Sequence, residues 1–173
     1  AMLNEEERLN TEISCIKAIL NIQQVYNRIF DYPEFVALFK NQTIKTYARI
    51  IREFVLSGKR PTSSDVLVKC TKEEKKIFTE KIYKCEDFQD IDYFEILTYD
   101  NIENELQDFI KLNHKQYTGK QRIENFRDGV LDIFSLIQNK IKIKDNPELV
   151  ESVLQEIKDI RAGKVQKYVS TGY

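Results

Sequence analysis

Apolar residues recur at intervals of three and four along almost the whole chain, which is the spacing of a buried helix face. The first such stretch predicts a helix over residues 5–21, with an apolar face formed by Leu9, Ile13, Ile16 and Leu20. The 173 residues include five glycines and three prolines, too few for a β fold rich in turns. Hydrophobic residues make up 42% of the chain, which is enough for a core. The sequence therefore predicts an all-α protein.

Residues 1–90 are predicted to form an N-terminal bundle of five helices. Asn4 and Glu7 have the spacing of a capping box at the start of the first helix. Pro33 is expected to close a short second helix, since the residue before a proline is driven out of the α region. The apolar residues of that second helix are Val25, Ile29 and Phe30.

The remaining helices of the bundle have clear ends in the sequence. Gly58 and Pro61 are expected to stop a longer helix, whose apolar face is Ile44, Tyr47, Ile51, Phe54 and Val55. Ser64 is expected to cap a short helix that runs through Val66 to Val68. Thr71 and Glu74 repeat the capping-box spacing before the apolar residues of a fifth helix, Ile77, Phe78 and Ile82.

Residues 91–144 are predicted to form a long antiparallel helical hairpin within the same domain, with Gly119 at its turn. The face of the first helix is Tyr99, Ile102, Leu106, Phe109 and Asn113, and that of the returning helix is Ile123, Phe126, Val130, Ile133, Ile137 and Ile141. One reading is that this seam serves only the contact inside the hairpin. The apolar surface of the returning helix is wider than one seam requires, however, and this favours self-association of the chain. The predicted contact residues are Phe126, Val130, Leu131, Phe134 and Ile137, with Leu136 extending the same surface.

Residues 145–173 are predicted to be a linker helix and the start of a junction to a C-terminal domain that the sequence does not contain. Asn146 and Pro147 suit the cap and the first helical position, and Gly163 suits the residue after the helix. The apolar stripe of this helix is Leu149, Val150, Val153, Leu154, Ile157 and Ile160. Because the residues after Gly163 are mostly polar and add no core, we expect the stripe to dock on a partner.

No pattern in the sequence indicates catalysis. None of the five glycines lies in the G-x-x-x-x-G-K-[ST] pattern of a phosphate-binding loop, so we expect no ATP site in this segment. The sole histidine, His114, lies near a predicted helix end, where a cationic imidazole is stabilised. Acidic pairs such as Asp90 and Asp92, or Glu103 and Glu105, are interpreted as a solvated face. The sequence predicts no catalytic residue and no cofactor, and this segment is not expected to be an enzyme.

The cysteines and the overall charge are equally uninformative about chemistry. Cys15, Cys70 and Cys85 have neither C-x-x-C spacing nor a nearby histidine, so we expect reduced and mostly buried thiols rather than a metal site. The formal net charge of −1 gives no general attraction to nucleic acid or to an anionic membrane. The chain has no apolar run long enough to span a membrane and no signal peptide, which predicts a cytoplasmic location.

Three segments resemble the DnaB-type replicative DNA helicases. The apolar residues Val153, Leu154, Ile157 and Ile160, followed by Val169–Tyr173, are similar to the junction between that family's linker helix and its RecA-like ATPase domain. Residues 12–20 resemble the family's opening helix, and residues 35–61 resemble its F…IF…L…G-x-P segment. The usual acidic residue after G-x-P-I is replaced here by Thr62-Ser63-Ser64, and the spacer after the hairpin is unusually rich in lysine. A phage-encoded or otherwise divergent relative fits these departures best.

The resemblance implies that the chain is the N-terminal collar domain and linker of a hexameric, ATP-dependent helicase that unwinds duplex DNA at the replication fork. It implies subunit pairing through the hairpin, a surface for primase and helicase loader, and docking of the linker helix on a neighbouring subunit. ATP and magnesium are expected only in the C-terminal domain, DNA passes through the full-length ring, and the location is the cytoplasm of a bacterium or of a phage's host. The alternatives are a stand-alone helical adaptor or regulatory protein that binds a partner through its C-terminal helix, and an α-helical enzyme that uses Asp and Glu, which no pattern supports.

Overall fold

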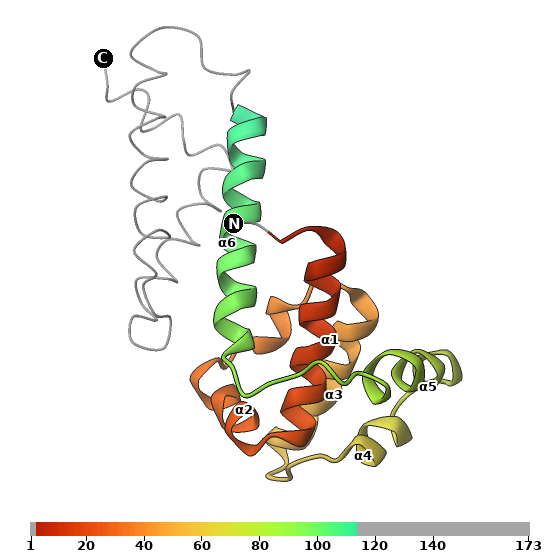
Figure 1. The fold of residues 1–173 in the computed structure, drawn as a ribbon. Coiled ribbons are helices and arrows are strands. Elements are labelled where there is room, and N and C mark those ends of the chain that lie inside the picture. The colour runs from red at the N-terminus through yellow and green to blue at the C-terminus, as the bar shows by residue number, and fades with distance from the viewer. Residues whose placement is uncertain (1–2, 114–173) are drawn as a thin grey trace, which may run out of the picture. The chain divides into compact units, whose positions relative to one another are not determined.

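The computed structural model describes residues 3–113, and the regular structure in that range is entirely helical (Figure 1). This confirms the all-α prediction for that part of the chain. The structure divides into a compact unit over Leu3–Thr98 and a second unit that begins at Tyr99. The predicted returning helix of the hairpin and the predicted linker helix lie outside the described residues. None of the helices within residues 3–113 is long and apolar enough to cross a membrane.

Helix α1, Glu5–Asn21, has the predicted bounds and contacts three other elements of the first unit: α2, α3 and η3 (Figure 1). The predicted capping box is confirmed, because the Asn4 side chain accepts a hydrogen bond from the Glu7 backbone N–H at 2.8 Å and the Glu7 carboxylate accepts one from the Asn4 N–H at 3.1 Å. Ile13, Ile16 and Leu20 are buried as predicted, and α1 is therefore the central helix of this unit.

Three short elements follow α1: α2 over Gln23–Arg28, and two 3₁₀ turns, η1 over Ile29–Asp31 and η2 over Phe35–Leu38. Val25 and Ile29 are buried as predicted, but Phe30 is 64% exposed and its assignment to the buried face is wrong. The α-helix ends at Arg28, and the 3₁₀ turn that replaces it has three residues per turn instead of 3.6. Phe30 also lies five residues after Val25, about 140° around an α-helix, so it falls off the buried face of Val25 and Ile29.

Helix α3, Gln42–Leu56, packs on α1 and on η2. The Asn41 side chain caps it by accepting a hydrogen bond from the Ile44 backbone N–H at 3.0 Å. Of the predicted apolar face, Ile44, Tyr47 and Ile51 are buried. The last two residues, Phe54 and Val55, are half-buried. The predicted stop at Gly58 is confirmed, since Gly58 has the positive φ of 80° that commonly follows a helix end.

The last part of the first unit contains α4 over Ser63–Val68, α5 over Lys72–Ile77 and a π-helical continuation, η3, over Phe78–Tyr83. The cap predicted for α4 is wrong by two residues: Thr62, not Ser64, accepts a hydrogen bond from the Asp65 backbone N–H, at 3.2 Å. Asp65 lies three residues after Thr62 and returns a bond to the Thr62 N–H, which completes a capping box. The predicted box between Thr71 and Glu74 is confirmed.

Two groups of aromatic rings fill the core of the first unit. The Phe94 ring lies 5.1 Å from the Tyr32 ring and 6.1 Å from the Phe35 ring, and the Tyr47 and Phe78 rings meet edge to face at 5.2 Å. Phe94 belongs to the first turn of α6, Tyr93–Asn113, which contains the first helix predicted for the hairpin. The start of α6 therefore completes the core of the first unit.

Replacing Gly58 with alanine is expected to lower the free energy of unfolding by about 1–2 kcal/mol, the cost of a left-handed conformation for an L residue. A Cβ at this position would have no atom within 4 Å, so the effect comes from the backbone and not from a clash. Gly58→Asn is the matched control, because asparagine tolerates the left-handed region better. Urea unfolding followed by circular dichroism measures both variants. Equal losses for alanine and asparagine would contradict this explanation.

Candidate functional site

The residues predicted to mediate contacts lie outside the described part of the chain. This applies to the predicted self-association surface, Phe126, Val130, Leu131, Phe134 and Ile137, and to the predicted docking stripe, Leu149, Val150, Val153, Leu154, Ile157 and Ile160. His114 also lies outside it. Candidates within residues 3–113 are therefore the buried polar groups, the cysteines and the exposed side chains.

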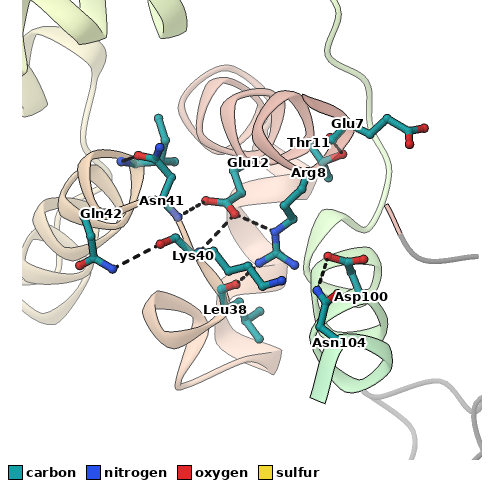
Figure 2. Close-up of polar contacts among 11 residues, drawn as sticks. Glu7, Arg8, Thr11, Glu12, Leu38, Lys40, Asn41, Gln42, Asp100 and Asn104 are labelled. Atoms are coloured by element: carbon teal, nitrogen blue, oxygen red, sulfur yellow. Dashed lines mark hydrogen bonds and ion pairs between the residues drawn. The ribbon is translucent and has the colours of Figure 1, made fainter. Parts of the chain in front are cut away.

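Two of the buried charged groups, Arg8 and Glu12, lie one turn apart on α1 (Figure 2). The Arg8 Nε donates to Glu12 Oε2 at 2.7 Å, and the two side chains are 7% and 1% exposed. A second guanidinium nitrogen of Arg8 donates to the backbone carbonyl of Leu38. Charged side chains are rarely buried to this extent unless they are paired, so the pair requires an explanation from its contacts.

The Glu12 carboxylate binds the segment that leads into α3 (Figure 2). Its Oε2 accepts a hydrogen bond from the Lys40 backbone N–H at 3.1 Å, and its Oε1 accepts one from the Asn41 N–H, also at 3.1 Å. Both carboxylate oxygens are thus occupied by fixed donors from Arg8, Lys40 and Asn41. The cluster can hold residues 38–41 against α1.

The predictions from sequence did not include Arg8 and Glu12. Their spacing does contain a clue, because Arg8, Glu12, Cys15 and Ile19 form a row at i, i+4, i+7 and i+11 along one side of α1, and all four are buried. A charged pair of opposite sign at i and i+4 in a row with apolar residues indicates a buried ion pair. The partners in residues 38–41 have no such local clue.

The interpretation of Asp90 and Asp92 as a solvated face holds for Asp90, which is exposed, but Asp92 is half-buried and accepts hydrogen bonds on both carboxylate oxygens. The Asp92 Oδ2 accepts a hydrogen bond from the Tyr32 hydroxyl at 3.0 Å, and its Oδ1 accepts one from the Glu95 backbone N–H at 3.1 Å at the start of α6. Asp90 forms an ion pair with Arg28 at 2.8 Å. Burial, and then the nearby Asp92 carboxylate, raises the pKa of Tyr32, which keeps its hydroxyl protonated as a donor. These carboxylates fix the start of α6.

The prediction of mostly buried, reduced cysteines is confirmed: the three thiols are free, Cys15 and Cys70 are buried, and Cys85 is half-buried. Burial raises the pKa of the Cys15 thiol well above its usual value, so this side chain stays protonated and unreactive near neutral pH. Within residues 3–113, no three histidine, cysteine, aspartate or glutamate side chains come together in a group that could hold a metal ion.

Several large apolar side chains of the first unit are exposed and come from different elements. The four most exposed are Phe30 on η1, Leu56 on α3, Val68 on α4 and Tyr83 on η3. The Lys17 ammonium lies 5.3 Å from the centre of the Tyr83 ring and donates to the Tyr83 carbonyl at 2.8 Å. Exposed apolar residues that occur singly are normal on a protein surface, so these side chains do not by themselves mark a binding site.

No family model, no curated protein and no solved structure matches this chain. Its site must therefore be interpreted from geometry. The Glu12 and Asp92 carboxylates each connect one segment to the start of a helix, and the Tyr47 hydroxyl does the same for α5 by donating to the Glu74 carbonyl at 2.6 Å. These buried and half-buried polar groups connect segments of the bundle to one another.

Glu12→Gln is expected to lower the free energy of unfolding by about 3 kcal/mol, because it removes one partner of a buried ion pair and leaves Arg8 facing a neutral amide. The amide also presents a donor toward groups that already donate. Urea unfolding with circular dichroism measures the loss. Glu6→Gln, at an exposed position in the first turn of α1, is the matched control and should change stability by less than about 0.5 kcal/mol. A Glu12 variant as stable as this control would show that the pair contributes nothing.

Proposed function

We propose that this chain is the N-terminal collar and linker of a DnaB-type replicative helicase, and that it organises the ring while a separate C-terminal domain hydrolyses ATP. The observation that most supports this is the position of the two N-terminal segments that carry the resemblance. Residues 12–20 lie on α1, and residues 35–61 cover η2, α3 and the stop at Gly58. These elements contact one another and form the centre of the bundle, as expected if the resemblance reflects a shared core.

The use of the polar groups also supports an organising role. The buried Arg8 and Glu12 side chains and the half-buried Asp92 side chain are engaged in fixing helix starts and connecting segments. The exposed apolar side chains on separate elements offer contact points for other proteins, which in this proposal are primase and helicase loader. ATP and magnesium belong to the C-terminal domain, and DNA passes through the ring that six full-length subunits form.

Phe134→Glu is expected to convert an associated form of the 173-residue chain into a monomer. The sequence predicts more apolar surface on the returning helix than the hairpin seam uses, and each Å² buried between subunits contributes roughly 25 cal/mol. Sedimentation equilibrium at micromolar concentrations measures the change, and circular dichroism checks that the helix content is kept.

Asn139→Glu is the matched control for this substitution, since Asn139 lies on the side of the predicted helix opposite to the seam. It should leave the association constant unchanged within about twofold. A wild-type chain that stays monomeric up to about 100 μM, already a weak affinity, would contradict pairing through the hairpin.

In the full-length protein, Leu154→Asp is expected to leave the collar folded and to weaken hexamer assembly and DNA unwinding. The substitution places a carboxylate in the middle of the predicted apolar stripe, and burial of an unpaired charge between subunits is strongly unfavourable. Gel filtration measures the oligomer, and a strand-displacement assay measures unwinding by the purified protein.

Gln155→Asp is the control, because residue 155 points away from the stripe on a helical projection and its new charge stays solvated. An intact hexamer with undiminished unwinding in the Leu154 variant would contradict docking of the linker helix and would mean that the helix only connects the two domains. A natural reading frame that stops near Tyr173, without a Walker A motif further on, would overturn the helicase proposal and favour a stand-alone adaptor.

A further inference from the structure

The solvent side of α3 carries a row of cations. Lys45, Arg49 and Arg52 lie at i, i+4 and i+7, which places them on one side of the helix, away from the buried Ile44 and Ile51. Arg49 and Arg52 are exposed and Lys45 is half-buried. At 1.5 Å of rise per residue, the three cations span about 10 Å along the helix axis. We call these three residues the α3 basic stripe.

The cations of this stripe have no anionic partner among residues 3–113. The other three arginines in that range are all engaged: Arg8 with Glu12, Arg28 with Asp90, and Arg60 with the Gln23 amide. Glu53 lies one turn after Arg49, in the position to form an ion pair with it, yet no such pair forms in the structure. The α3 basic stripe is therefore an unneutralised surface.

Such a row weakens the helix that carries it. Like charges three or four residues apart on a helix repel one another, and here both intervals, Lys45 to Arg49 and Arg49 to Arg52, join cations. Positions that break a local stability rule without a compensating contact are the places where a functional demand is expected. An anionic ligand along the stripe would remove the repulsion.

The net charge of the chain conceals this concentration of cations. Residues 42–60 contain five lysines and arginines and one glutamate, whereas the stretch between Lys84 and Lys111 contains nine carboxylates and no cation. The formal net charge of −1 is the sum of segments of opposite sign. Attraction of a polyanion depends on the local field of the basic segment, not on the sum.

We propose that the α3 basic stripe binds the phosphate backbone of a nucleic acid. Phosphate contacts are made mainly by lysine and arginine, and they need no particular base sequence. A protein partner is less well matched, because the buried core of a protein interface is depleted of charged residues and centres on apolar and aromatic ones, whereas the stripe consists of charged residues only. Beside the stripe lie the polar Gln42 and Thr46, and the exposed apolar residue Leu56 lies beyond its C-terminal end. This proposal rests on the charges of α3 and does not depend on the helicase assignment.

The test is fluorescence anisotropy of a labelled 20-nucleotide single strand, and of the corresponding duplex, titrated with the 173-residue chain. For three phosphate contacts, the logarithm of the affinity for a single strand should fall with the logarithm of salt concentration with a slope of about −2. Between 50 and 200 mM salt the affinity should therefore fall about 20-fold. In the double variant Arg49→Gln, Arg52→Gln, one contact remains and the fall should be about threefold.

The control is the double variant Lys72→Gln, Lys76→Gln, which removes the same charge from exposed positions of α5 and should keep the wild-type slope. Arg49→Lys with Arg52→Lys should keep it as well, because the charge is retained. Thermal melts of all variants verify the fold.

The proposal is overturned if the wild-type chain does not bind the strand or the duplex at 50 mM salt, or if the α3 and α5 variants lose affinity equally. It is also overturned if the α3 variant loses binding to a poly-glutamate peptide while nucleic-acid binding is unaffected. That result would assign the stripe to an acidic protein.

Discussion

The Glu12 carboxylate is the contact on which the arrangement of the first unit depends. It accepts hydrogen bonds from Arg8 on its own helix and from the backbone of Lys40 and Asn41, 28 and 29 residues away. Asn41 also caps α3 with its side chain, so the same residue binds α1 through its backbone and starts α3. Because a buried carboxylate is strongly unfavourable without partners, the two backbone N–H groups at the start of α3 help Arg8 to compensate the burial of Glu12 on α1.

A carboxylate also joins a distant segment to a helix start at the beginning of α6. Asp92 caps that helix and accepts the hydrogen bond of Tyr32, which joins the segment after η1 to the beginning of α6. The rings of Tyr32, Phe35 and Phe94 then pack behind this contact. Buried polar groups here specify which segments meet, and the apolar core supplies most of the stabilisation.

Over residues 3–113, the arginines on the surface also fall into two groups, those with partners in the fold and those without. Arg28 and Arg60 bind groups on other elements and so help to hold the fold, whereas Arg49 and Arg52 face solvent without partners in the described part of the chain. Cations that are not needed for folding remain available for a ligand. In the proposals above, Arg28 and Arg60 keep the bundle folded, whereas Arg49 and Arg52 contact nucleic acid.

Within residues 3–113, sequence patterns predicted the helices and several of their ends. Asn4, Gly58 and Thr71 were identified correctly because capping boxes and glycine stops are local, formed by residues three or four apart. The exposure of Phe30 was missed because Phe30 lies five residues after Val25, whereas residues that share a helix face are three or four apart. Only the tertiary structure revealed the partners of Glu12 and Asp92, which lie about 30 and 60 residues away. Helical periodicity shows which face of a helix is buried, but it carries no information about which other segment covers that face.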